Sequence, residues 1–278
     1  MNKKRIVTLM CAIIVLLAGA VYYFQFTKTG EEKLYDIFGG NNLHLVANGK
    51  EIYWFDVRHS NDPNAPMFQR IENALTEFNP DLVLVEGGFN TFEGERDAAI
   101  YEGESAFATY LAKQNGTPVE DIEPPFNRQI EYLQTKYLAE EILAMYLIRQ
   151  ISSMQFADNS FGWDFDKFLL SESQSLIENG LDYNGTTMED ILNTVNAFLP
   201  EPVNGDNWRD VDFRRLNWVY TKENGVLYPI YNDVYNFRNI YLVDLIKEKK
   251  EMHDKIFILM GGAHLADTKD QLNELYSN

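Results

Sequence analysis

A strand–helix–strand pattern near the start of the globular part constrains the fold most. Residues 51–57 are a β-rich run, and the Asn48-Gly49 pair before them is typical of a tight hairpin turn. Residues 66–80 then carry apolar side chains at helical spacing, and residues 81–88 are a short apolar run that ends at two glycines. This succession predicts a βαβ unit with parallel pairing and a right-handed crossover.

The remaining segments continue an α/β pattern with a helical middle. Hydrophobic spacing predicts further helices at 105–116, 127–151, 165–180, 188–200, 233–251 and 266–276, and a buried strand at 255–260. We therefore expect a mixed, largely parallel central sheet flanked by helices, with a helical insertion in the middle. The 278 residues suit one such domain over 43–278, preceded by a linker at 28–42.

The first 27 residues have the composition of a membrane-targeting segment. Three basic residues at positions 3–5 precede an uncharged, mostly apolar run at 6–24, which matches the length of a bilayer-spanning helix. Basic residues on the amino-terminal flank favour export of the rest of the chain. We expect an anchored domain outside the cytoplasm, in the periplasm or at the cell surface. The Ala18-Gly19-Ala20 pattern leaves a cleaved signal peptide and a secreted domain as the alternative.

Charge and cysteine content exclude several classes of function. The net charge of −18 repels phosphate backbones, which argues against a nucleic-acid partner. The single cysteine, Cys11, lies inside the apolar amino-terminal run. The expected exported domain therefore has no disulfide and no thiolate, and any metal in it must be bound by His, Asp or Glu.

Functional side chains follow three of the predicted strands. Arg58-His59 follows the first, Glu86 ends the second, and His264 stands just after Gly261-Gly262 at the end of the third. In open α/β sheets, ligands bind beyond the carboxyl ends of the strands. Two imidazoles and one carboxylate form a ligand set for a divalent transition metal, and glycines allow close approach to the backbone. His44 and His253 are expected to be structural.

Four short stretches resemble one known superfamily. They are DLVLVEGG, GESAFATYLA, FRNIYLVDLI and KIFILMGGAHL, and they resemble proteins of the TraB, PrgY and GumN group, the Tiki metalloproteases, the erythromycin esterases and the haem-binding ChaN proteins. Members share two Gly-x-x-His motifs, a strand-end glutamate and an arginine on the helix before the last strand. Residues 261–264 match one motif fully, whereas Asp56 replaces the glycine of the other, which ends at His59.

The resemblance implies roles for several residues. It implies metal binding by His59, Glu86 and His264, with Mn, Co or Zn as the ion. The arginine motif corresponds to Arg238, which would stabilise an oxyanion or bind a substrate carboxylate, unless it forms only a salt bridge. Glu104 opens a predicted helix, where a carboxylate is favoured and is suited to act as a general base. Further candidates for the site are Asp56, Arg58, Glu123, Asn239, Gly261 and Gly262.

Two functions follow as expectations. The first is a membrane-anchored, extracytoplasmic hydrolase of peptide or ester bonds that is either metal-dependent or based on acid–base catalysis. The second is a non-catalytic protein of the same superfamily that binds haem or a peptide, for which the many aromatic residues are suited. The membrane, through residues 6–24, and a peptide or small molecule are the expected partners.

Overall fold

The computed structural model describes residues 41–58, 60, 62–156, 164–211 and 225–277. The predicted membrane segment at 6–24 and His59 lie outside these ranges. Within them, no helix combines the length and the apolar character that crossing a bilayer requires.

The chain divides into two compact units. One comprises residues up to Ile122 together with Val243 onward, and the other comprises Glu123–Leu242. The first unit contains the whole sheet, and the second is helical. The predicted mixed α/β class and its helical middle insertion are therefore confirmed.

A five-stranded sheet forms the centre of the first unit. Its spatial order is β1 (Leu43–Ala47), β2 (Lys50–Val57), β5 (Lys255–Gly261), β3 (Leu82–Val85) and β4 (Val119–Asp121). β1 pairs antiparallel with β2, and all the other neighbours are parallel. The predicted hairpin is confirmed, because Asn48 and Gly49 join β1 to β2 with φ values of 54° and 79°.

The carboxyl-terminal strand separates the two strands of the predicted βαβ unit. β2 and β3 run parallel as expected, but each pairs with β5 instead of with the other, so the predicted direct pairing is wrong. β5 is buried along Ile256–Met260. A strand that is apolar on both faces gains most at the centre of a sheet, between two partners.

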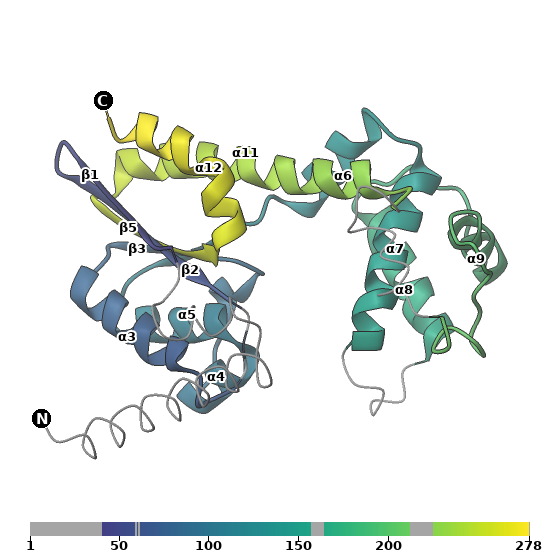
Figure 1. The fold of residues 1–278 in the computed structure, drawn as a ribbon, viewed down its shortest axis with the longest axis horizontal. Coiled ribbons are helices and arrows are strands. Elements are labelled where there is room, and N and C mark those ends of the chain that lie inside the picture. The colour runs from purple at the N-terminus through teal and green to yellow at the C-terminus, as the bar shows by residue number, and fades with distance from the viewer. Residues whose placement is uncertain (1–40, 59, 61, 157–163, 212–224, 278) are drawn as a thin grey trace, which may run out of the picture. The chain divides into compact units, whose positions relative to one another are not determined.

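Helices cover both faces of the sheet (Figure 1). On one face lie α3 (Pro66–Phe78), α4 (Arg96–Glu102) and α5 (Glu104–Gln114), together with the short helix η1 (Phe89–Thr91). On the other face lies α12 (Gly262–Leu275), which packs against the end of the long helix α11 (Tyr228–Met252). The Lys250 ammonium of α11 lies 4.5 Å from the centre of the Tyr276 ring, just after α12.

Helix α3 follows its sequence pattern closely. Its predicted apolar positions are all buried, and they are Met67, Phe68, Ile71, Leu75 and Phe78. Pro66 occupies the first turn, where its missing N–H costs no hydrogen bond. Asn79 ends the helix with a left-handed φ of 49°. The predictions for this segment are confirmed.

The second unit is a cluster of helices packed around one hydrophobic core. They are α6 (Phe126–Gln134), α7 (Ala139–Phe156), α8 (Phe165–Glu178), α9 (Met188–Asn196) and the first part of α11. The prediction of one helix over 127–151 is wrong, because the chain breaks between Thr135 and Leu138. The Glu141 carboxylate accepts a hydrogen bond from the Leu138 backbone N–H at 2.9 Å and so favours a new helix start there. Leu138, which lies at this break, is 67% exposed.

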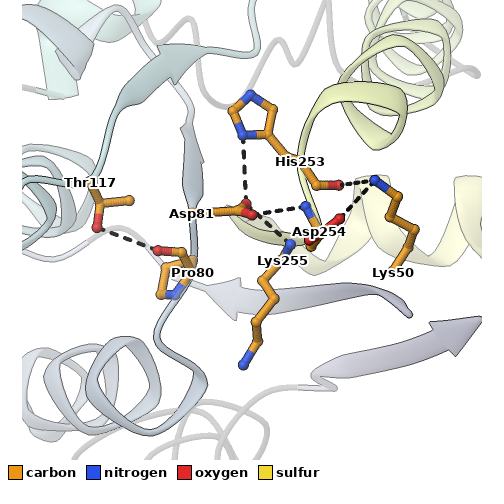
Figure 2. Close-up of polar contacts among 7 residues, drawn as sticks. All are labelled: Lys50, Pro80, Asp81, Thr117, His253, Asp254 and Lys255. Carbon is orange, nitrogen blue, oxygen red and sulfur yellow. Dashed lines mark hydrogen bonds and ion pairs between the residues drawn. The ribbon is translucent and has the colours of Figure 1, made fainter.

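The amino-terminal ends of β3 and β5 are tied together by one carboxylate (Figure 2). Asp81 accepts hydrogen bonds from the backbone N–H groups of Asp254 at 2.8 Å and of Lys255 at 3.1 Å. His253 Nδ1 lies 3.6 Å from the same carboxylate, and Lys50 reaches Asp254 from β2 at 2.8 Å. This edge is built from structural contacts, as expected for His253.

Candidate functional site

The parallel strands bring several of the predicted site residues to one edge of the sheet. β5 is central, with β2 and β3 on either side, and Val57 of β2 is in register with Gly261 of β5. Neighbouring strands lie ~4.8 Å apart. Arg58, Glu86 and Gly262 therefore follow three consecutive strands at their carboxyl ends, opposite to the edge that Asp81 ties together.

His264 lies in the first turn of α12. Gly261, which ends β5, is also the residue preceding the helix, and His264 is 6% exposed. The predicted closing helix at 266–276 is confirmed, but it begins four residues earlier than expected, at Gly262. The chain passes from strand to helix at Gly261 without a loop, and the first turn contains no acidic residue. The buried imidazole therefore lies in the helix turn that directly follows the end of the central strand.

Asp56 fills the space beside Gly262. Its side chain is 8% exposed and accepts a hydrogen bond from the Asn41 backbone N–H at 2.9 Å. A Cβ added to Gly262 would lie only 2.5 Å from Asp56 Oδ1. The carboxylate therefore packs against the first residue of α12, where the helix dipole favours a negative charge. The Asp56 departure from the resembled motif is accommodated by the absence of a side chain at position 262.

Glu104 lies next to the segment that follows β2. It is the first residue of α5, as predicted, and is 4% exposed. Its Oε2 accepts a hydrogen bond from the Ser60 backbone N–H at 3.4 Å. The preceding Gly103 has a φ of 108°, which glycine adopts readily. A buried carboxylate from α5 thus contacts the loop beyond β2, and its catalytic role stays a prediction.

Glu86 follows β3 directly and is partly exposed. Gly87 and Gly88 come next with left-handed φ values of 86° and 75°. A Cβ on Gly88 would lie 3.7 Å from Asp121 Oδ2, so a second carboxylate reaches this corner from the end of β4. Asp121 was not predicted from the sequence, because β4 has only three residues and lacks the apolar run by which a strand is recognised.

Arg238, Glu123 and Asn239 lie in the second unit. The Arg238 guanidinium binds Glu123 with two hydrogen bonds, from Nε to Oε2 at 2.8 Å and from Nη2 to Oε1. Asn239 follows it on α11 and is buried. Of the two roles expected for Arg238, the structure contains the salt bridge, and its oxyanion role stays a prediction.

A buried tyrosine that was not predicted lies near this ion pair. Gln129 donates a hydrogen bond to the Tyr146 hydroxyl, linking α6 to α7. Burial raises the pKa of Tyr146 to about 12, although the positive charges of Arg149 and Arg238 act in the opposite direction. Tyr146 therefore keeps its proton at neutral pH. Nothing in the apolar spacing of α7 distinguishes this tyrosine from a core residue.

Two of the three predicted metal ligands, Glu86 and His264, lie among the residues that the structure describes. Across the described ranges of the chain, no three His, Cys, Asp or Glu side chains are grouped closely enough to hold a metal ion. His264 and Glu86 supply an imidazole and a carboxylate at the same edge, and His59, the third predicted ligand, lies outside the described residues. The set of His59, Glu86 and His264 stays a prediction.

No family model, no curated protein and no solved structure matches this chain. The resemblance to the TraB and Tiki superfamily therefore stays a prediction that is based on the four short motifs.

Proposed function

We propose that this protein is a hydrolase of peptide or ester bonds whose reactive groups lie at the carboxyl edge of the sheet. The observation that carries the proposal is the buried imidazole of His264 at the end of the central strand. Glu104, buried beside the Ser60 backbone, supplies the carboxylate. An imidazole and a carboxylate are the usual pair for general acid–base catalysis near neutral pH.

In the proposed reaction, Glu104 accepts a proton from a water molecule as its oxygen attacks the carbonyl carbon of the substrate. The new C–O bond forms first, and the bond to the leaving nitrogen or oxygen then breaks. His264, in its imidazolium form, donates a proton to that leaving atom, and the carboxylic acid and the amine or alcohol are released. Proton exchange with solvent then returns Glu104 to the carboxylate and His264 to the imidazolium. Glu86 at the neighbouring strand end orients the substrate.

A divalent ion such as Mn, Co or Zn would be held by His59, Glu86 and His264, and it would supply a Lewis acid and an acidified water. The steps proposed above involve only protein side chains and do not depend on this ion. We also propose that residues 6–24 anchor the protein in the membrane with the domain outside the cytoplasm, or direct its secretion if they are removed.

The test is a screen of the full-length protein in detergent against libraries of fluorogenic peptides and esters. We expect turnover of at least one substrate, and Glu104→Gln should lower its kcat by about 100-fold or more, as loss of a general base does. Asp97→Asn on the neighbouring helix α4 is the matched control and should leave kcat unchanged. Metal analysis of the same preparation tests whether the protein binds a divalent ion. The proposal fails if Glu104→Gln retains the full rate on every substrate.

A second candidate is a non-catalytic protein that binds haem or a peptide. It is favoured by the ion pair between Arg238 and Glu123. This pair occupies the guanidinium that the hydrolase resemblance would assign to an oxyanion. Adding haem to the full-length protein separates the two functions. A Soret band that His264→Ala abolishes would support the binding function, and turnover without a Soret band would support the hydrolase.

A further inference from the structure

We propose that a groove between the β1–β2 hairpin and α3 binds a small zwitterionic aromatic compound of the class of free aromatic amino acids. The groove lies on the α3 face of the sheet, opposite to the face that α12 covers, and the proposal is independent of the hydrolase proposed above. The cavity has a volume of about 450 Å³. This volume suits a small ligand.

Aromatic side chains form its walls. The rings of Tyr53 and Phe78 have centroids 5.5 Å apart, and the His44 ring lies 5.7 Å from each of them. His44 meets Phe78 edge to face, at an interplanar angle of 89°. Such walls favour a flat ring, which gains from offset or edge-to-face packing in addition to burial of its area.

Lys255 provides the positive charge. Its ammonium lies 4.7 Å from the centroid of the Phe78 ring. Figure 2 shows its side chain directed away from Asp81 and Asp254. In the part of the chain that the structure describes, Lys255 has no carboxylate within ion-pair distance. Phe78 itself is buried, and the His44 and Tyr53 rings form the accessible part of the wall. The ammonium is therefore positioned to bind a carboxylate of a ligand whose ring packs against His44 and Tyr53.

Glu77 provides the negative charge. The groove is lined by two cations, Arg70 and Lys255, and by two carboxylates, Glu51 and Glu77. Glu51 is already bound by His44 Nε2 at 3.0 Å. Glu77 is exposed on α3, and no ion pair joins it to another described residue. A lining with charges of both signs favours a zwitterion over a simple anion or cation.

Tyr53 adds a directional contact. Its hydroxyl oxygen accepts a hydrogen bond from Asn42 Nδ2 at 3.1 Å, so the hydroxyl proton is left to donate to a ligand. The groove thus combines an aromatic wall and a hydroxyl with charges of both signs, of which Lys255 and Glu77 are proposed to bind the carboxylate and the ammonium of an aromatic amino acid.

The test is isothermal titration of the full-length protein in detergent with L-phenylalanine. Three analogues each lack one feature: L-leucine lacks the ring, phenethylamine lacks the carboxylate, and 3-phenylpropionate lacks the ammonium. We expect each analogue to bind at least about tenfold more weakly, since a charge-assisted hydrogen bond or a stacked ring is lost. Equal affinity for L-phenylalanine and any one analogue would overturn the proposal.

Variants assign the two charges. Lys255→Met should weaken L-phenylalanine about tenfold and leave phenethylamine unchanged, whereas Glu77→Gln should weaken L-phenylalanine and leave 3-phenylpropionate unchanged. Lys269→Met on the exposed side of α12 is the matched control. His264→Ala should retain full binding, which separates this site from the proposed hydrolase. Circular dichroism verifies folding, and unchanged affinity in both groove variants would overturn the proposal.

Discussion

At the scale of single residues, Asp56 and Gly262 depend on each other. The resembled motif has glycine at position 56, and this chain has a buried carboxylate there. The carboxylate occupies the space that any side chain at position 262 would need. The sequence alone identified both residues as candidates for the site. Their contact was not predictable, because it depends on the register that pairs Asp56 with Met260 of β5.

Gly262→Ala should destabilise the first unit by about 1–3 kcal/mol, because overpacking of a buried site forces its neighbours to move. The added Cβ would lie 2.5 Å from Asp56 Oδ1. Denaturant unfolding of the full-length protein, followed by circular dichroism, measures the change.

Two further variants make this prediction specific. Gly261→Ala should cost much less, since the atom nearest to its Cβ would be Val57 O at 4.0 Å. Adding Asp56→Gly to Gly262→Ala should restore part of the lost stability. A double variant that is as unstable as the sum of the two single changes would contradict the contact.

At the scale of elements, local signals were predictable and long-range ones were not. The hairpin at Asn48-Gly49 and helix α3 follow from turn chemistry and apolar spacing, which act within a few residues. The insertion of β5 between β2 and β3 depends on pairing across about 200 residues, which no local pattern encodes. The break after α6 depends on one side chain, Glu141, bonding to the Leu138 backbone.

The Asp81 carboxylate should contribute measurably to the pairing of β3 and β5. Asp81→Ala removes the acceptor for two backbone N–H groups, so we expect a loss of about 1–2 kcal/mol in the free energy of unfolding. Asp81→Asn, which keeps one acceptor oxygen, should lose less. Asp270→Ala on the exposed side of α12 is the control. Equal unfolding midpoints for Asp81→Ala and the control would refute this role.

The start of α9 should respond to acid. Thr187 and Asp190 form a capping box, and hydrogen bonds from the Thr187 hydroxyl and backbone lower the pKa of Asp190. A carboxyl with a lowered folded-state pKa stabilises the protein above its unfolded-state pKa of about 3.9. That stabilisation is lost as the pH falls through the folded-state pKa.

Carboxyl-carbon NMR titration measures this effect directly. Asp190 should titrate below the ordinary range in the wild type and within it in Thr187→Ala. The stability advantage of the wild type over Asp190→Asn at pH 6 should disappear in strong acid. An ordinary titration of Asp190 in the wild type would show that the capping box is not formed.

At the scale of the whole molecule, the sheet decides which predicted residues share a site. The sequence supplied His264, Glu86 and Glu104, and the parallel topology brings the segments that carry them to one edge. Asp121 could not be predicted from the sequence, since the pattern of a three-residue strand is too short to recognise. Glu123 and Arg238 belong to a second compact unit, a division that apolar spacing along the chain does not reveal.

The most direct test of the proposed hydrolase compares two histidines at opposite edges of the same sheet. On the best substrate from the screen, His264→Ala in the full-length protein should lower kcat/KM by about 100-fold or more, the usual effect of losing a general acid. His253→Ala, at the edge that Asp81 ties together, should leave kcat/KM within about twofold of wild type, as expected for a group remote from the reaction. Wild-type turnover by His264→Ala, or an equal loss in both variants, would contradict a reactive site at the carboxyl edge.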